Sequence, residues 1–264
     1  MDSAATDRTR RLVGDDAVAA LARSRVLVLG LGGVGSWCVE ALARAGVGTL
    51  GLLDCDAVSP SNLNRQLGAL TSTIGRRKTE VLRDRVLDVN PAARVECFDL
   101  RYGPDTADLV DLSRWDAVAD AIDLVSAKIL LVVRARRAGV WLVSAMGAGN
   151  KLDPSGFRLA DLSRTDRCPL AKVMRKKLRR LGIERPPVVF SPEEPRRPFG
   201  ADPAARVQTA GTLPSVVGAA GLVLAQAVLD RLMGPPAAPL ACAARERDLR
   251  AARAPRVAPE PRLR

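Results

Sequence analysis

The chain has 264 residues, and its 41 Lys and Arg outnumber 29 Asp and Glu, giving a net charge of +12. This excess favours a polyanionic partner, although residues 245–264 contribute part of it with seven arginines and three acids. The absence of histidine excludes a Ser–His or Cys–His nucleophile and a His-ligated metal site. The length suits one large α/β domain.

Cysteine usage and apolar patterning predict a cytoplasmic protein without a membrane partner. None of the five cysteines forms a CxxC pair, so we expect no structural zinc, and unpaired thiols fit a reducing compartment. We expect Cys38 in the core and Cys168, in a polar loop, as the most available thiol. The first twenty residues lack an apolar core, which argues against a signal peptide. The apolar run 213–229 predicts a buried helix.

A strand, a Gly-rich turn and a helix come first in the predicted domain. The apolar run 26–29 precedes GLGGVG at 30–35, and a helix-favouring run follows at 36–45. A second apolar run ends in Asp54, nineteen residues after Gly35. Glycines and the N–H groups of a helix start suit phosphate, and an acid at the second strand end suits ribose hydroxyls. The pattern predicts a nucleotide site that includes Gly30, Gly32, Gly33, Gly35 and Asp54.

Basic residues downstream of Asp54 favour a triphosphate over a redox dinucleotide. The segments SNLNRQ at 61–66 and GRRK at 75–78 follow the acid. Arg65 and Lys78 are types that neutralise phosphate oxygens, and Asn62 can donate a hydrogen bond without adding charge. Either cation alone would be interpreted as a solvated surface charge, but their order after a Gly-rich turn favours a phosphate clamp.

The remaining elements alternate between strands and helices, which predicts an α/β fold with a Rossmann-like, doubly wound, mostly parallel sheet. Helices are expected at 76–89 and 126–138, and strands at 94–98, 117–120, 141–144 and 157–162. A crossover loop is expected at 186–203. Ligands on such sheets lie at the carboxyl ends of strands, so Gly30, Asp54 and Asp123 should share one edge.

A predicted helix at 170–181 has a dense cationic face. Its expected apolar stripe consists of Leu170, Val173, Met174, Leu178 and Leu181. Positions 172–180 hold six basic residues and no acid, whereas solvated helices usually mix signs. We therefore expect nucleic-acid binding by Lys172, Arg175, Lys176, Lys177, Arg179 and Arg180.

The motifs GxGGxG, DxD, SNLNRQ and GxxK resemble those of the adenylating family of ubiquitin-activating enzymes. This ThiF-like family includes molybdopterin-synthase and thiamine-sulfur-carrier adenylyltransferases, and the resemblance spans about residues 11–232. It implies that ATP and Mg²⁺ are bound, with the metal at Asp123, which the spacing favours over Asp120. It also implies a homodimer in which Arg11 reaches the neighbouring protomer's site. The implied catalytic residues are Arg65, Lys78, Asp123 and Arg11, and the implied ATP-binding residues are Gly30, Gly32, Gly33, Gly35, Asp54, Asp56, Asn62, Arg65, Gln66, Lys78 and Asp123.

Further segments are similar to those of one branch, the tRNA threonylcarbamoyladenosine dehydratases. They are DAIDLVSAK at 120–128, GAGNKLDP at 147–154, PLA at 169–171 and VFSPE at 189–193. The resemblance implies an enzyme that adenylates the carboxylate of threonylcarbamoyladenosine in tRNA and cyclises it, releasing AMP and pyrophosphate. Some members carry a cysteine where this chain has Val188, so the resemblance does not extend to a sulfur-relay role at that site. A sulfur-transfer protein stays open as a further partner.

The implied domain organisation has four segments. Residues 1–24 form a helical segment, 25–150 the ATP-binding Rossmann-like part, 151–233 the tRNA-facing part of the same fold, and 234–264 a disordered basic tail.

Two other functions compete with the dehydratase reaction. An adenylyltransferase that activates the C-terminus of a ubiquitin-like sulfur carrier would have a protein partner and little nucleic-acid affinity. An NAD-dependent oxidoreductase, or a non-catalytic nucleotide-binding module, would leave Asn62, Arg65 and Lys78 without a role. Acyl adenylation needs no covalent protein nucleophile, which agrees with the missing histidine.

Overall fold

The computed structural model describes residues 4–200 and 210–234, and its centre is a mostly parallel sheet. Within these residues seven strands are ordered β3-β2-β1-β4-β5-β7-β6. All neighbouring pairs are parallel except β6 and β7. The predicted doubly wound α/β fold is confirmed. In chain order the strands are β1 (Arg25–Leu29), β2 (Thr49–Leu53), β3 (Arg94–Phe98), β4 (Ala117–Asp120), β5 (Trp141–Ala145), β6 (Arg158–Asp161) and β7 (Pro187–Phe190).

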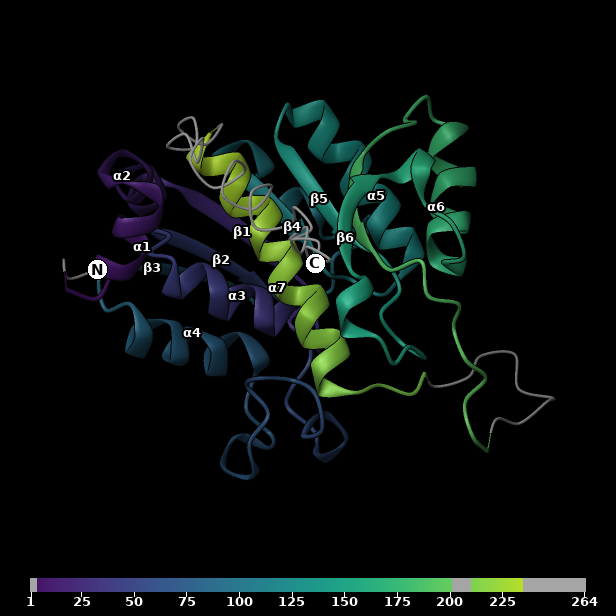
Figure 1. Ribbon diagram of the computed structural model, residues 1–264, viewed down its shortest axis with the longest axis horizontal. Coiled ribbons are helices and arrows are strands. Elements are labelled where there is room, and N and C mark those ends of the chain that lie inside the picture. Colours follow the sequence, from purple (N-terminus) through teal and green to yellow (C-terminus); the bar gives the residue numbers. More distant parts are fainter. Residues whose placement is uncertain (1–3, 201–209, 235–264) are drawn as a thin grey trace, which may run out of the picture. The chain divides into compact units, whose positions relative to one another are not determined.

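Helices cover both faces of this sheet (Figure 1). The α-helices are α1 (Asp7–Val13), α2 (Asp15–Arg23), α3 (Gly35–Arg44), α4 (Lys78–Val89), α5 (Val125–Ala138), α6 (Pro169–Arg179) and α7 (Pro214–Met233). Short 3-10 helices lie in the connections: η1 (Pro60–Asn62), η2 (Thr71–Thr73), η3 (Ala107–Leu109), η4 (Leu112–Arg114), η5 (Pro154–Gly156) and η6 (Leu162–Arg164).

The strands are buried on both faces because their side chains alternate between two cores. Val26 and Val28 of β1 pack in one core with α3, α4 and α7. Leu27 and Leu29 of the same strand pack in the other core with α5 and α6. The two cores hold the strand ends rigidly, so the polar residues that directly follow those ends are also held in place.

The predicted buried helix near the end of the fold is α7. It has the length and apolar composition of a membrane-spanning helix, but nine of its residues are buried in the fold. In Figure 1, α7 runs diagonally over the sheet on the same side as α3. A Cβ at Gly221 would lie 2.3 Å from the carbonyl oxygen of Val34 and 2.8 Å from Cβ of Trp37. The glycine is therefore what allows α7 to approach α3 so closely.

The predicted crossover loop over 186–203 is wrong at its start, because β7 occupies Pro187–Phe190. This strand inserts between β5 and β6. Val188, Val189 and Phe190 are buried strand-forming residues, and Pro187 stands at the first strand position, where proline is tolerated. The predicted tail at 234–264 lies, apart from Gly234, outside the described residues.

Candidate active site

An open pocket of about 560 Å³ lies at the carboxyl ends of the parallel strands. This volume is typical of small-molecule sites. Residues that follow β1, β2, β3, β4 and β5 all line it, as expected for ligand sites on such sheets. The structure thus brings together most of the residues that the sequence singles out, namely Gly30, Gly32, Gly33, Asp54, Asp56, Asn62, Arg65, Gln66, Lys78 and Asp123.

The Gly-rich turn passes close to the neighbouring strand end. Gly30 has φ +83°, and a Cβ there would lie 2.6 Å from the carbonyl oxygen of Ala121. Gly35 does not line the pocket; a Cβ there would lie 1.8 Å from the carbonyl oxygen of Gly30. The first glycine therefore shapes the pocket floor, whereas Gly35 lets α3 begin directly beneath it.

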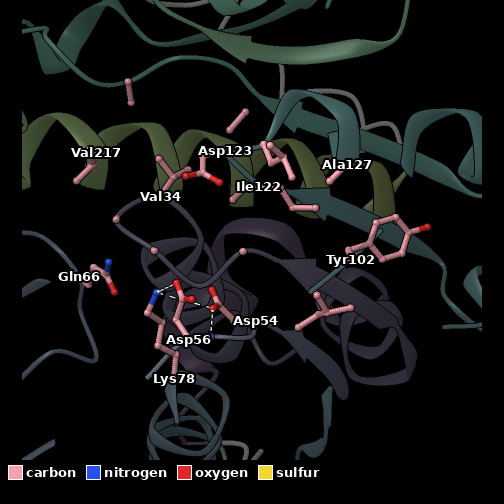
Figure 2. A pocket seen from close by; sticks show the side chains of 18 of the residues that line it. Val34, Asp54, Asp56, Gln66, Lys78, Tyr102, Ile122, Asp123, Ala127 and Val217 are labelled. Atoms are coloured by element: carbon pink, nitrogen blue, oxygen red, sulfur yellow. Dashed lines mark hydrogen bonds and ion pairs between the residues drawn. The ribbon is translucent and has the colours of Figure 1, made fainter. Parts of the chain in front are cut away.

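Two acids and a lysine gather below this turn (Figure 2). Asp54 accepts hydrogen bonds from the backbone N–H of Leu31 at 2.7 Å and of Asp56 at 2.9 Å. Nζ of Lys78, the first residue of α4, lies 2.8 Å from Oδ2 of Asp56 and 3.7 Å from Oδ1 of Asp54. The hydrogen bond from Lys78 lowers the pKa of Asp56. Lys78 is only 7% exposed, so its charge is held at the pocket wall by these carboxylates.

Asp54, Cys55 and Asp56 have ligand atoms within 4.8 Å of one another and would be a candidate metal site by geometry alone. Lys78 already pairs with both acids, and its positive charge makes the cluster less favourable for a cation. Burial also raises the pKa of the Cys55 thiol, and the thiolate is the metal-binding form.

Arg65 and Asn62 reach the pocket from the segment after β2. The side-chain oxygen of Asn62 accepts the N–H of Ser59 at 3.1 Å, which closes the turn of η1. Nη1 of Arg65 donates to the carbonyl oxygen of Ser61 at 2.7 Å and to Oδ1 of Asn64 at 2.9 Å. The guanidinium is thus ordered by its own loop while it lines the pocket.

Asp120 and Asp123 differ sharply in environment. Asp120 is fully buried, 3.0 Å from Nζ of Lys128, and accepts the hydroxyl of Ser144 at 2.6 Å. Asp123 is exposed and lines the pocket, on the opposite side from Lys78 in Figure 2. Asp120 therefore serves the buried network, and Asp123 is the acid of the two that is available to a ligand. Sequence reasoning gave no role to Lys128, whose burial depends on packing between α5 and β4.

Sequence reasoning also missed two parts of the pocket wall. Arg101 and Tyr102 follow β3 and line one end, and burial raises the pKa of Tyr102. Their position after a strand end was a signal that could have identified them. The other part consists of residues 145–149, at the end of β5 and just after it, together with Leu170 at the start of α6. Apolar surface at both ends suits a ligand larger than a phosphate group.

Arg11 lies outside the pocket of its own chain. Its side chain is 74% exposed, and its Nε is 2.8 Å from Oδ2 of Asp7 on the same helix. One protomer by itself therefore does not bring Arg11 to the nucleotide residues.

The basic helix α6 begins at the pocket and carries its cations outward. Five of the six predicted residues are exposed, namely Lys172, Lys176, Lys177, Arg179 and Arg180. Arg175 is only partly exposed, because its guanidinium donates to the carbonyl oxygens of Thr165, at 2.6 Å, and Leu162. The predicted apolar stripe is wrong for Val173 and Leu181, which are exposed, whereas Ala171 is buried.

Cys168 is shielded rather than available. It is 3% exposed at the N-cap of α6, and its Sγ lies 3.6 Å from where a Cβ of Gly147 would be. The loop that carries Cys168 turns its thiol under the pocket wall, so the polar flanks misled the sequence prediction. The four cysteines in the described part of the chain are unpaired.

Comparisons with known proteins agree with this geometry. A model described as the ThiF family matches residues 6–256. The chain is 39% identical over 238 residues to tRNA threonylcarbamoyladenosine dehydratase of Bacillus subtilis, covering 86% of this chain and 93% of that protein. The crystal structure of Escherichia coli tRNA N6-threonylcarbamoyladenosine dehydratase with AMP superposes with a TM-score of 0.80 and 34% identity over 88% of this chain and 95% of that one. The structure of the same enzyme with ATP superposes with a TM-score of 0.79 and 33% identity, covering 88% of this chain and 94% of that one.

Proposed function

Because the chain belongs to the ThiF family, we propose that it is an ATP-dependent dehydratase acting on the threonylcarbamoyladenosine of tRNA. The observation that carries the proposal is the joint placement of Arg65, Lys78 and Asp123 around one pocket. The likeness to dehydratases over nearly the whole chain supports it. The sulfur-carrier alternative is not favoured, since dehydratases match this chain over most of its length.

In the proposed reaction, the substrate carboxylate attacks the α-phosphorus of ATP and pyrophosphate leaves. An atom of the carbamoyl group then attacks the activated carbonyl, and AMP leaves with the oxygen that the carboxylate has lost. The net change in the nucleoside is loss of one water. The protein contributes positioning and charge stabilisation, which are the main sources of catalysis in phosphoryl chemistry.

Each pocket residue has a distinct task in this scheme. The Gly-rich turn lets backbone N–H groups approach the phosphates, and the carboxylate of Asp54 accepts ribose hydroxyls beside the two N–H groups that already orient it. Lys78 shifts from Asp56 to a phosphate oxygen, while Arg65 binds a second phosphate. Asp123, an exposed carboxylate, is a suitable ligand for Mg²⁺, which would neutralise phosphate charge when bound.

We assign the exposed cations of α6 to the tRNA backbone. Lys172, Lys176 and Arg179 recur at intervals of four and three, so they share one face of the helix. They span about 10 Å along the axis at 1.5 Å per residue. Leu170 at the same helix end lines the pocket. Phosphate contacts along this face would position RNA without reading its sequence.

The active unit in this proposal is a cytoplasmic homodimer. Arg11 is exposed and outside its own pocket, so it is free to act in the site of a second protomer. Isologous pairing would then place one Arg11 at each of two equivalent pockets.

Nucleoside mass analysis tests the function directly. tRNA bearing threonylcarbamoyladenosine is incubated with the protein, ATP and Mg²⁺, then digested and analysed, while AMP is quantified in parallel. We expect the nucleoside to lose one water for each AMP formed. A reaction with an ATP analogue that cannot be cleaved between the α- and β-phosphates is the control. An unchanged nucleoside in the presence of protein that binds ATP would exclude the proposed reaction.

A further inference from the structure

The first turn of α3 is tied to the segment that carries Arg65. Nε1 of Trp37 donates to the backbone carbonyl of Arg65 at 3.2 Å. The hydroxyl of Ser36 accepts the N–H of Leu67 at 3.1 Å and donates to the carbonyl of Gly32 at 2.7 Å. Two adjacent side chains of α3 thus bond the backbone at Arg65 and Leu67, and Ser36 also bonds the Gly-rich turn.

The helix α7 restrains Trp37 from the other side. A Cβ at Gly218 would lie 3.5 Å from Cε2 of the indole, and one at Gly221 would lie 2.8 Å from Cβ of Trp37. Both glycines belong to a helix with nine buried residues. The indole is therefore held between a rigid core helix and the Arg65 backbone, and it has little space in which to turn.

Arg65 itself is packed against the Gly-rich turn. Its Cγ lies 3.4 Å from where a Cβ of Gly33 would be, and its guanidinium is ordered by contacts within the segment 61–65. These local contacts move with the segment as one piece. The position of the guanidinium in the pocket consequently depends on what fixes the backbone, and Trp37 provides a direct bond to it.

We propose that Trp37, assisted by Ser36, is a positioning residue that places Arg65 at the phosphate end of the pocket. This inference rests on the proposed function, in which Arg65 binds a phosphate. Phenylalanine at position 37 would keep much of the packing against α7 but would lose the N–H donor. If this donor acts by positioning Arg65, its loss should slow the reaction only when the arginine side chain is present.

A double-mutant cycle provides the test. Trp37→Phe is made in the parental chain and in Arg65→Ala, and kcat for AMP formation is measured with saturating ATP and tRNA. Slow variants are assayed with enzyme in excess over tRNA. Trp141→Phe is the matched control, since Trp141 lies at the start of β5 and is partly buried against the core.

Trp37→Phe should lower kcat about three- to tenfold in the parental chain and less than twofold in Arg65→Ala. The control should change kcat less than twofold in both. Ser36→Ala is also made in the parental chain and in Arg65→Ala, and its effect on kcat should likewise be lost in Arg65→Ala. If Trp37→Phe does not fold, the Ser36→Ala cycle is the test of the proposal. Unfolding midpoints ensure that only folded proteins are compared.

The outcomes separate the inference from the function on which it rests. An impaired Arg65→Ala with equal losses from Trp37→Phe in both backgrounds would show that Trp37 acts through the fold alone. A parental rate for folded Trp37→Phe would also overturn the positioning role, and either result would leave the dehydratase reaction intact. A parental rate for Arg65→Ala would instead overturn the phosphate clamp and, with it, the role of Trp37.

Discussion

Replacing Lys78 with methionine tests the phosphate clamp most directly. The lysine is 7% exposed at the start of α4, and its Nζ lies 2.8 Å from Asp56 and 3.7 Å from Asp54. Methionine keeps a flexible apolar side chain of similar length, so the packing of α4 should be largely retained. The change therefore removes the charge while leaving most of the shape of the pocket wall.

The magnitude follows from the contacts that are lost. A hydrogen bond to a charged group contributes about 1.5–3 kcal/mol, which corresponds to roughly ten- to 150-fold in affinity or rate. Without Lys78, the carboxylates of Asp54 and Asp56 would also face the incoming phosphates without this cation. We therefore expect the loss to fall in the upper half of that range.

The assay compares ATP binding by calorimetry with AMP formation in the presence of tRNA. Arg83→Ala is the control, because it removes one positive charge from the same helix at a partly exposed residue that pairs with Asp84 at 3.0 Å. It should change ATP affinity less than twofold. If Lys78→Met binds ATP and forms AMP within twofold of the parental protein, Lys78 only balances the two acids and the clamp assignment fails.

Three further outcomes are expected. Changing Lys172, Lys176 and Arg179 to alanine should flatten the dependence of log tRNA affinity on log salt by about two units, at roughly 0.7–0.9 per lost phosphate contact. The KM for ATP should not change, and an unaltered slope would place the tRNA elsewhere. Arg11→Ala and Asp123→Asn should each be inactive, but a mixture that exchanges subunits should regain part of the activity; confirmed exchange without recovery would contradict an arginine acting across the dimer. Burial raises the pKa of Glu40, but hydrogen bonds from Arg85 and Arg44 lower it overall, so Glu40→Gln should destabilise the fold by about 1–2 kcal/mol at pH 7. The pKa of Glu40 is lower in the folded than in the unfolded protein. The stability difference between parent and Glu40→Gln should therefore be present above the usual glutamate pKa of about 4.3 and disappear as the pH falls through the folded pKa. Urea unfolding at several pH values measures this difference, and a difference that does not change with pH would refute the reasoning.

The sequence predicts best those features that are local along the chain. The strands β3 and β4 have the predicted bounds, because short runs of apolar residues between turn signals are characteristic of buried strands. Three glycines of the Gly-rich turn, Asp54 and three residues of the segment 61–66 line one pocket, since parallel strands end on the same edge.

Features that depend on what packs opposite a residue were not predictable in this way. Lys128 looks like a surface lysine on a helix, but Asp120 arrives from β4 to pair with it. Arg175 looks like one of six equivalent cations, yet Thr165 folds back to accept its guanidinium. The strand β7 could not be predicted, because its proline-rich flanks resemble those of a loop. It is identified as a strand by its pairing with β5 and β6.

The arrangement of the last strands also bears on how sequence changes there reach the nucleotide residues. The strip from β6 through α6 to β7 pairs with the rest of the sheet through two register positions, Ser144 with Val188 and Ala145 with Val189. The strands whose ends carry the Gly-rich turn, Asp54 and Asp123 lie on the other side of β5. Few strand pairs therefore join the strip, with its basic helix, to the strands that position the nucleotide residues, and the core that Met174 and Phe190 share with Leu27 and Leu29 is a second connection. Sequence changes in this margin of the sheet should reach the nucleotide residues through that core and through Leu170, which lines the pocket, rather than through strand pairing.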